Sequence, residues 1–592
     1  MDTVKDQVTG SISQMRNLTT AYTFIPRTLM APLRQTMIRR DKQLHIGHII
    51  RSALRTRLDL EDGILQSTVS KAFEHGFRET MRERWGQWKQ SIASPTSEVL
   101  DSTPQDLYQL GAIHYNCGTL DGTYEVHQAI MLNQFSLDIK ANSQQFREQL
   151  RLFHGDQKTV AFIRSVRSDQ VDSECPYEKR DWLLPIPGLF HVQMHVQQVL
   201  LRTHWTAANQ NGASTKSKHT LLSDLGFLSY TGISRDNAPF HALDHLIKVS
   251  FDARILAFFF RILESEGLLN PSEDRIVEHI EHVLQTISKR TYNTAIAKLM
   301  NLLFSKDSLI GEGKSTTGNK QKLPKRFVTL CRFMQIAQIY LVLRTVVRHG
   351  NTRAISQLCP LLSLIFLGAG KFHYGREMLY LSWLQQKNVS EPFLRQAILD
   401  SMLINRQGRK DSFMPTDRQN ELMNCDLALD LQMRKNSTHD FKKTFNMVAL
   451  SGPFLARMKR SMESAVKVKI SGKHTTKSSE LDVRNLAVNL WRSRQMDWDL
   501  PASQPSQDNE YLASDVIGEG LERLEKAVRS FNSDVVDQGP YEFLEQEDDP
   551  EPTAPQDIPT ITTDLVDLED SEDSEASEDL EDLENLRDLE NQ

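Results

Sequence analysis

The stretch Arg151–Asp169, RLFHGDQKTVAFIRSVRSD, changes character at its centre. Its first part is a short apolar run that predicts a strand, and the run breaks at the tripeptide GDQ (155–157). The second part has the apolar spacing of a helix, with Arg164 and Arg167 expected on the helix surface. A strand followed at once by a helix predicts an α/β unit at this point of the chain.

Asp156 stands where this strand should end, and two roles are open for it. An Asp just before a helix accepts a hydrogen bond from a backbone N–H group of the first turn, which is the ordinary N-cap role. Carboxylates at strand ends also hold metal ions in α/β folds, because chemistry gathers at that edge of a sheet. Position alone favours the cap.

Length and composition bound the class of protein. The chain has 592 residues, 39% of them hydrophobic, which is enough for several packed units. Its five cysteines include no CxxC pair, which argues against a zinc ribbon or a disulfide framework and suits a reducing compartment. The first 20 residues have no apolar signal core, and the longest apolar runs are ILAFFF (255–260) and LLSLIFLGAG (361–370). Both are shorter than the roughly 20 residues that span a bilayer, so we expect an intracellular protein, nuclear or cytoplasmic, with no membrane partner.

Charge is distributed unevenly along the chain. Residues 541–592 hold 21 acidic residues and one arginine, which leaves 69 basic and 56 acidic residues, a net charge of +13, for residues 1–540. A basic body is compatible with a polyanionic partner such as DNA. The acidic segment predicts a disordered tail. It either keeps the protein in solution, folds back on the basic surface as an electrostatic mimic, or recruits protein partners.

Changes in composition divide the chain into four segments. They are a helical N-terminal arm (1–95), a main domain (106–491) made of a strand-containing centre (106–197) and a helical region (221–491), a linker with a short helix (492–540), and the acidic tail (541–592). Within the centre, LRLFHGD (150–156) and WLLPIPGLFH (182–191) have the clearest strand character. The expected fold is α-rich α+β, with a small strand-containing centre and a large helical insertion.

Two histidine pairs have the i, i+4 spacing that places side chains on one face of a helix, as in many zinc sites. They are His191 with His195, and His241 with His245, the latter next to Asp244. The glutamate of an HExxH motif is absent and no third ligand is identified. We interpret these histidines as core or capping residues.

Two basic segments have weak motif character. GEGKS (311–315) resembles part of a phosphate-binding loop, but Ser308 stands where that motif needs its first glycine, and a helical stretch precedes it instead of a strand. We interpret it as a loop. KQKLPKR (320–326) is either a solvated loop or a weak nuclear signal.

Asp417 and Glu421 lie four residues apart in MPTDRQNELMN (414–424), so a helix would place both on one face. Two interpretations are open. They are either ordinary surface charges of a helix or part of a carboxylate site.

Several blocks between Thr119 and Trp491 together resemble a fungal family of domains of unknown function, of the DUF 6589 type. The combination of GDQ (155–157), WLLPIPGLFH (182–191) and FHALD (240–244) makes the resemblance specific, and KFHYGREML (371–379) adds to it. Families of this kind resemble transposon-derived proteins. The resemblance therefore implies a diverged ribonuclease-H-like centre.

In that fold class, three carboxylates hold two divalent ions, Mg²⁺ or Mn²⁺, that cut or join nucleic-acid strands. The resemblance makes Asp156 and Glu421 candidate catalytic residues, Asp156 after the central strand and Glu421 on a helix beyond the insertion. Asp156, Glu421 and His191 are the candidate metal ligands. The first acid of such a site should lie on a strand upstream of Asp156, but that sequence is mainly helical, and Asp121 in GTLDGTYE (118–125) has the setting of a turn.

Three functions remain open, and whether the protein is an enzyme is open with them. The first is a catalytically inactive, transposon-derived protein that binds nucleic acid through its basic body. The second is a divalent-metal nuclease or transposase that uses Asp156 and Glu421. The third is a non-enzymatic scaffold whose acidic tail recruits protein partners. The missing first acid favours the first.

Overall fold

The structure is a computed structural model of the chain. It describes residues 21–433 except 28–30, 60–64, 89–98, 206–219, 305–311, 315–319 and positions 112, 114, 237 and 407, then seven isolated positions between 451 and 466, and finally residues 479–498 and 511–536 except 495. The expected acidic tail lies outside these described residues.

Helices dominate the described residues, as the sequence predicts. In the first half these are α2 (Ile46–Asp59), α3 (Leu65–Gly76), α4 (Arg78–Trp88), α5 (Leu120–Gln128), α6 (Ser143–Glu148), α7 (Gln157–Asp169), α8 (Leu189–His204), α9 (Leu221–Leu228), α10 (Phe240–Ser265), α11 (Ile276–Thr286) and α12 (Lys289–Phe304). In the second half these are α14 (Lys325–Arg348), α15 (Thr352–Gly368), α16 (Phe372–Leu384), α17 (Pro392–Ser401), α18 (Thr416–Met433), α20 (Glu480–Arg492) and α21 (Val516–Phe531). Short 3-10 or π-helical turns are η1 (Gln35–Met37), η3 (Ala129–Gln134) and η4 (Asn532–Val536).

The strands are short and pair two by two. The antiparallel pairs are β1 (Tyr22–Thr23) with β2 (Tyr108–Gln109), β5 (Glu312–Lys314) with β6 (Lys320–Lys322), and β7 (Leu403–Ile404) with β8 (Met414–Pro415). The two strands expected in the centre, β3 (Arg151–Gly155) and β4 (Leu183–Pro187), form a parallel pair in which Arg151 lies opposite Leu183 and Gly155 opposite Pro187. The sequence thus predicted this strand-containing centre correctly.

The β3–α7–β4–α8 segment separates two apolar cores. Successive side chains of a strand point to opposite faces of a sheet. Accordingly, Leu184 and Ile186 of β4 belong to the main core, whereas Leu183 belongs to a smaller core that includes Phe146 and Trp182. The small sheet is therefore covered on both faces, as parallel strands generally are.

The main core is built around α10, α14 and α15. From Val249 to Phe260 every residue of α10 is buried, so this helix runs through the core and has no polar face there. Of the helices described, α14 is the one long and apolar enough to span a membrane, but most of its apolar stretch is buried against other helices. Its apolar character is therefore accounted for by packing inside the protein.

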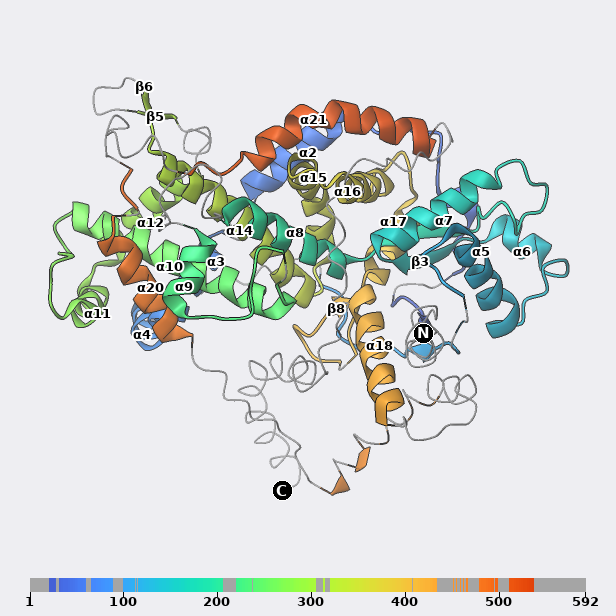
Figure 1. Cartoon of the computed structure of the whole chain (residues 1–592), viewed down its shortest axis with the longest axis horizontal. Coiled ribbons are helices and arrows are strands. Elements are labelled where there is room, and N and C mark those ends of the chain that lie inside the picture. The colour runs from blue at the N-terminus through green and yellow to red at the C-terminus, as the bar shows by residue number, and fades with distance from the viewer. Residues whose placement is uncertain are drawn as a thin grey trace, which may run out of the picture.

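The last two helices of the described residues, α20 and α21, pack against this core. In Figure 1, α21 lies along α2, α15 and α16, and α20 lies beside α10 and α9, while β3, α5, α6 and α7 gather at the opposite end of the molecule. The expected short helix in the linker is thus α21, and it packs against the body, with Leu524, Val528 and Phe531 buried.

Three local expectations were wrong. The segments 311–315 and 320–326, interpreted as loops, contain β5 and β6, which pair as antiparallel strands. Asp121 lies in the first turn of α5 and not in an open turn, because Thr119 caps that helix by accepting a hydrogen bond from the backbone N–H of Gly122. Arg164 and Arg167 are not surface residues of α7: their side chains are only 9% and 22% exposed. Both face carboxylates from distant parts of the chain, which a local sequence pattern does not reveal.

Candidate functional site at the strand ends

The carboxyl ends of β3 and β4 lie side by side, and each strand leads directly into a helix. The backbone N–H of Gly188, just after β4, donates to the carbonyl oxygen of Gly155 at 2.8 Å. The N-termini of α7 and α8 consequently meet at one edge of the parallel pair. This is the edge at which α/β folds place their ligands.

Asp156 occupies the N-cap of α7. Its Oδ1 accepts a hydrogen bond from the backbone N–H of Thr159 at 2.7 Å, and its backbone is extended, with φ −62° and ψ 174°. The cap role that the sequence favoured is therefore confirmed.

Asp417, in the first turn of α18, caps α8 from across the molecule. One carboxylate oxygen accepts from the backbone N–H of Phe190 at 3.0 Å, and the other accepts from the backbone N–H and from Nδ1 of His191 at 3.1 and 3.0 Å. The Asp417 side chain is 5% exposed, so it is not an ordinary surface charge. Gly188 permits this approach, since a Cβ there would lie 2.2 Å from Asp417 Oδ2.

The surroundings of His191 favour its protonated form. Burial by itself would lower its pKa, but the hydrogen bond to Asp417 and the negative charges of Asp417, Asp156 and Glu421 outweigh burial and raise the pKa to about 9. The imidazolium and the Asp417 carboxylate then form an ion pair that is mostly shielded from water, with the His191 side chain 21% exposed. The candidates Asp156, His191 and Glu421 are thus within electrostatic reach of one another.

Glu421 lies one turn further along α18, on the face it shares with Asp417, as the spacing predicts. Desolvation raises the pKa of its carboxyl group, and the charges of Asp417 and Asp156 add to this, while His191 and a hydrogen bond with Asn424 act in the opposite direction. The residue is nevertheless exposed to solvent. Three carboxylates therefore share one neighbourhood with a single imidazolium.

A buried polar network that the sequence did not point to supports this edge. The Tyr22 hydroxyl donates to the carbonyl oxygen of Thr416 at 2.6 Å, and the Thr416 hydroxyl donates to the carbonyl oxygen of Ser401 at 2.6 Å. His154 Nε2 lies 3.0 Å from the Ser401 hydroxyl, and burial lowers the pKa of His154 to about 4, so this imidazole is neutral. The network joins β1, β3, α17 and the start of α18. Because these residues are far apart in the sequence, no local sequence pattern could have predicted the network.

The side chains at this edge do not fit a divalent-metal centre as they stand. Within the described residues, no three His, Cys, Asp or Glu side chains are arranged to hold one ion. One oxygen of Asp156 accepts the cap hydrogen bond, and both oxygens of Asp417 accept hydrogen bonds. Nδ1 of His191 is occupied by its hydrogen bond to Asp417. The expected ligand set of Asp156, Glu421 and His191 therefore stays a prediction.

Of the other candidate histidines, His195 is buried, as interpreted, whereas His245 is exposed. The ring of His195 lies 3.8 Å from the ring of Tyr374, centroid to centroid, and burial lowers its pKa to about 3. His245 Nε2 lies 3.0 Å from the Tyr230 hydroxyl. Asp244 accepts from the Tyr340 hydroxyl at 2.6 Å and pairs with Arg344 at 3.2 Å.

Fold and site together define a helix-rich protein with a small parallel βαβ unit whose strand ends meet the N-terminus of a late helix. The model of a family of unknown function, DUF6589, matches residues 65–475, and the chain belongs to that family. The match begins inside the expected N-terminal arm, includes the whole site and stops before α20. No curated protein and no solved structure matches the chain.

Proposed function

We propose that the chain is a transposon-derived protein with a diverged ribonuclease-H-like centre, and that it binds nucleic acid without cutting it. The proposal that the protein binds without cutting rests on one observation. Asp156 and Asp417 hold the N-termini of α7 and α8, and Asp417 also pairs with the imidazolium of His191. These carboxylates therefore contribute to the fold.

The order of elements supports the first part. An acid follows the central strand β3, a second parallel strand and helix come next, and a long helical segment separates them from α18, which returns to the strand ends with Asp417 and Glu421. This is the arrangement that the resemblance to transposon-derived proteins implies. A recognisable first acid is absent from the sequence upstream, where Asp121 belongs to α5.

The hydrogen bonds already made by Asp156 and Asp417 support the proposal that the protein does not cut nucleic acid. Two-metal catalysis needs several carboxylate oxygens directed at ions roughly 3.5–4 Å apart. In this chain Asp417 is bound to His191 and to the N-terminus of α8, while Asp156 holds the N-terminus of α7. A metal ion on Asp417 would compete with the cap of α8 and with the ion pair to His191, whereas the second oxygen of Asp156 takes no part in the cap of α7.

Charge supports binding to a polyanion. Residues 1–540 have a net charge of +13, while the whole chain has −7 because the acidic segment follows. A basic body attracts phosphate backbones, and such binding weakens steeply as salt rises. The acidic segment should compete with nucleic acid for the same positive field.

The test is fluorescence anisotropy of labelled duplex and single-stranded DNA with the whole chain and with the chain ending at residue 540, each at low and moderate salt. We expect salt-sensitive binding that is tighter for the shorter chain, and intact DNA after incubation with Mn²⁺. Asp156→Asn should bind as the wild type does, with Asp169→Asn, an exposed position on the same helix, as the matched control.

Each outcome has a distinct meaning. Mn²⁺-dependent cleavage that disappears in Asp156→Asn and persists in Asp169→Asn would overturn the non-catalytic proposal in favour of a nuclease. No binding even at low salt would remove nucleic acid as the partner and leave the scaffold hypothesis.

A further inference from the structure

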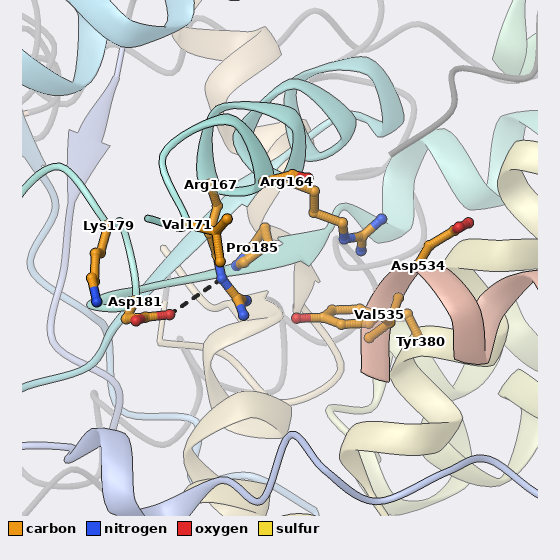
Figure 2. A pocket seen from close by; sticks show the side chains of 10 residues that line it. Arg164, Arg167, Val171, Lys179, Asp181, Pro185, Tyr380, Asp534 and Val535 are labelled. Carbon is orange, nitrogen blue, oxygen red and sulfur yellow. Dashed lines mark ion pairs between the residues drawn. The ribbon is translucent and has the colours of Figure 1, made fainter. Parts of the chain in front are cut away.

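A separate cavity of about 170 Å³ lies beyond the strand-end site, against the C-terminal half of α7. Figure 2 shows Arg164 and Arg167 reaching into it from α7, with Lys179 and Asp181 on one side and Tyr380 and Asp534 on the other. The walls come from α7, the loop before β4, α16 and η4. The two arginines that the sequence placed on a helix surface thus line a partly open cavity.

Some of the charges around the cavity neutralise one another. Arg164 forms a two-pronged ion pair with Glu377, with 2.6 Å between Nη2 and Oε2, and its guanidinium lies 4.2 Å from the centre of the Tyr380 ring. Arg376, just behind the wall, pairs with Asp534 at 2.8 Å. The positive charges of these two arginines are therefore cancelled by the negative charges of the two carboxylates.

The remaining cations outnumber the carboxylate that faces them. Asp181 accepts hydrogen bonds from Arg40 and also pairs with Arg167, with 3.3 Å between Arg167 Nε and Asp181 Oδ1. Lys179 lines the same side, and no carboxylate among the described residues pairs with it. Three cations, Arg40, Arg167 and Lys179, thus lie near the single carboxylate of Asp181, which leaves a surplus of two positive charges.

The two arginines that pair with Asp181 are partly buried, whereas the Asp181 side chain itself is 41% exposed. The side chains of Arg40 and Arg167 are 16% and 22% exposed. Burial, together with the charges of Arg40 and Arg164, lowers the pKa of Arg167 to about 9, although Asp181 acts in the opposite direction. Unbalanced buried charge is costly, and an anion between these groups would relieve the repulsion.

We propose that this cavity binds a phosphate dianion. The surplus of two charges matches a dianion, and guanidinium groups recognise phosphate oxygens through paired N–H donors. A cavity of about 170 Å³ has room for a phosphate group together with waters. Free phosphate and the terminal phosphate of an oligonucleotide present the same chemistry. The cavity does not depend on the proposed nucleic-acid function.

Isothermal titration calorimetry of the whole chain with inorganic phosphate, at constant ionic strength in a phosphate-free buffer, tests this proposal. Lys179→Gln removes a half-buried lining cation and should weaken phosphate binding at least tenfold. Lys158→Gln makes the same charge change on the exposed first turn of α7, away from the cavity, and should change the affinity less than twofold. Thermal unfolding of both variants verifies that they fold.

The source of the phosphate is resolved by a 5′-phosphorylated oligonucleotide and its unphosphorylated counterpart. Tighter binding of the phosphorylated form that is lost in Lys179→Gln identifies a nucleic-acid end as the ligand. Phosphate binding without oligonucleotide binding supports the cavity and contradicts the nucleic-acid proposal. No binding of inorganic phosphate, or equal weakening by Lys179→Gln and Lys158→Gln, would overturn the cavity proposal.

Discussion

At the scale of single residues, two substitutions of Asp156 distinguish its role as a helix cap from the effect of its negative charge. Its carboxylate caps α7 through Thr159. Asn caps helices about as well as Asp, whereas Ala does not. We therefore expect Asp156→Ala to lower the free energy of unfolding by about 1 kcal/mol, and Asp156→Asn to lower it by no more than a few tenths of a kcal/mol. Urea denaturation measures both, and an equal loss in the two variants would show that the charge matters and the cap does not.

His191 makes the stability depend on pH in a defined window. Its pKa is raised from the ordinary 6.5 to about 9 in the folded chain. A raised pKa means that the folded state holds the proton more tightly, so the stabilisation is complete below pH 6.5 and is lost as pH rises towards 9. We expect the stability difference between wild type and His191→Asn to shrink over that window, by up to about 3 kcal/mol.

His195→Asn is the matched control for this measurement. The pKa of His195 is lowered to about 3, so its imidazole is neutral throughout the window in which His191 titrates. The difference between wild type and His195→Asn should stay flat there. If the His191→Asn difference were equally flat, the ion pair with Asp417 would not exist in solution.

Gly188 tests the contact between α18 and the start of α8. A methyl group at this position would occupy the place of Asp417 Oδ2, so Gly188→Ala must displace the carboxylate from the backbone N–H groups of Phe190 and His191. Losing hydrogen bonds to a charged group costs about 1.5–3 kcal/mol. We expect a loss of that size in urea denaturation. Gly226→Ala, in α9 with open space around it, should be neutral or stabilising, and a similar loss there would make the Gly188 effect uninformative.

At the scale of elements, the close approach of α21 to α15 depends on two glycines. A Cβ at Gly520 would lie 2.0 Å from the carbonyl oxygen of Leu364, and one at Gly368 would lie 1.7 Å from the carbonyl oxygen of Val516. Gly520→Ala must separate the helices, and we expect it to destabilise by about 1–3 kcal/mol. Hydrogen exchange of the α21 amides, together with urea denaturation, measures the loss.

The matched control is Gly86→Ala on the exposed face of α4, where nothing lies within 4 Å of the added methyl group. Since alanine favours a helix over glycine, this change should stabilise by up to about 1 kcal/mol. If Gly520→Ala gained stability in the same way, α21 would not pack against α15 as described.

The elements also show which features the sequence could predict. β3, β4, α7 and the Asp156 cap follow from local signals: apolar runs, a Gly-Asp break and helical spacing. The position of Asp417 over the start of α8 depends on two segments more than 200 residues apart, and so does the burial of Arg164 against Glu377. Such contacts depend on the packing of the whole core. The spacing of Asp417 and Glu421 therefore predicted that they share one face of a helix, but it could not predict which residues that face contacts.

At the scale of the whole molecule, the structured body extends past the family match on both sides. The match covers residues 65–475, whereas α2 precedes it and α20 and α21 follow it. These outer helices bury apolar side chains in the main core, among them Ile49, Trp491 and Phe531. A fragment limited to the match would expose the surfaces that they cover, including the face of α15.

We therefore expect the fragment 65–475 to lack a cooperative thermal transition and to bind a dye that reports exposed apolar surface. The fragment 21–536, which keeps α2, α20 and α21, should unfold cooperatively with a midpoint close to that of the full chain. Burying a single large apolar side chain contributes about 1.5–3 kcal/mol, and a domain is typically stable by only about 5–15 kcal/mol, so losing three packed helices removes more than the reserve. Calorimetry of the two fragments tests this expectation. A cooperative transition in the fragment 65–475 would mean that the region matched by the family model folds on its own and does not need α2, α20 and α21.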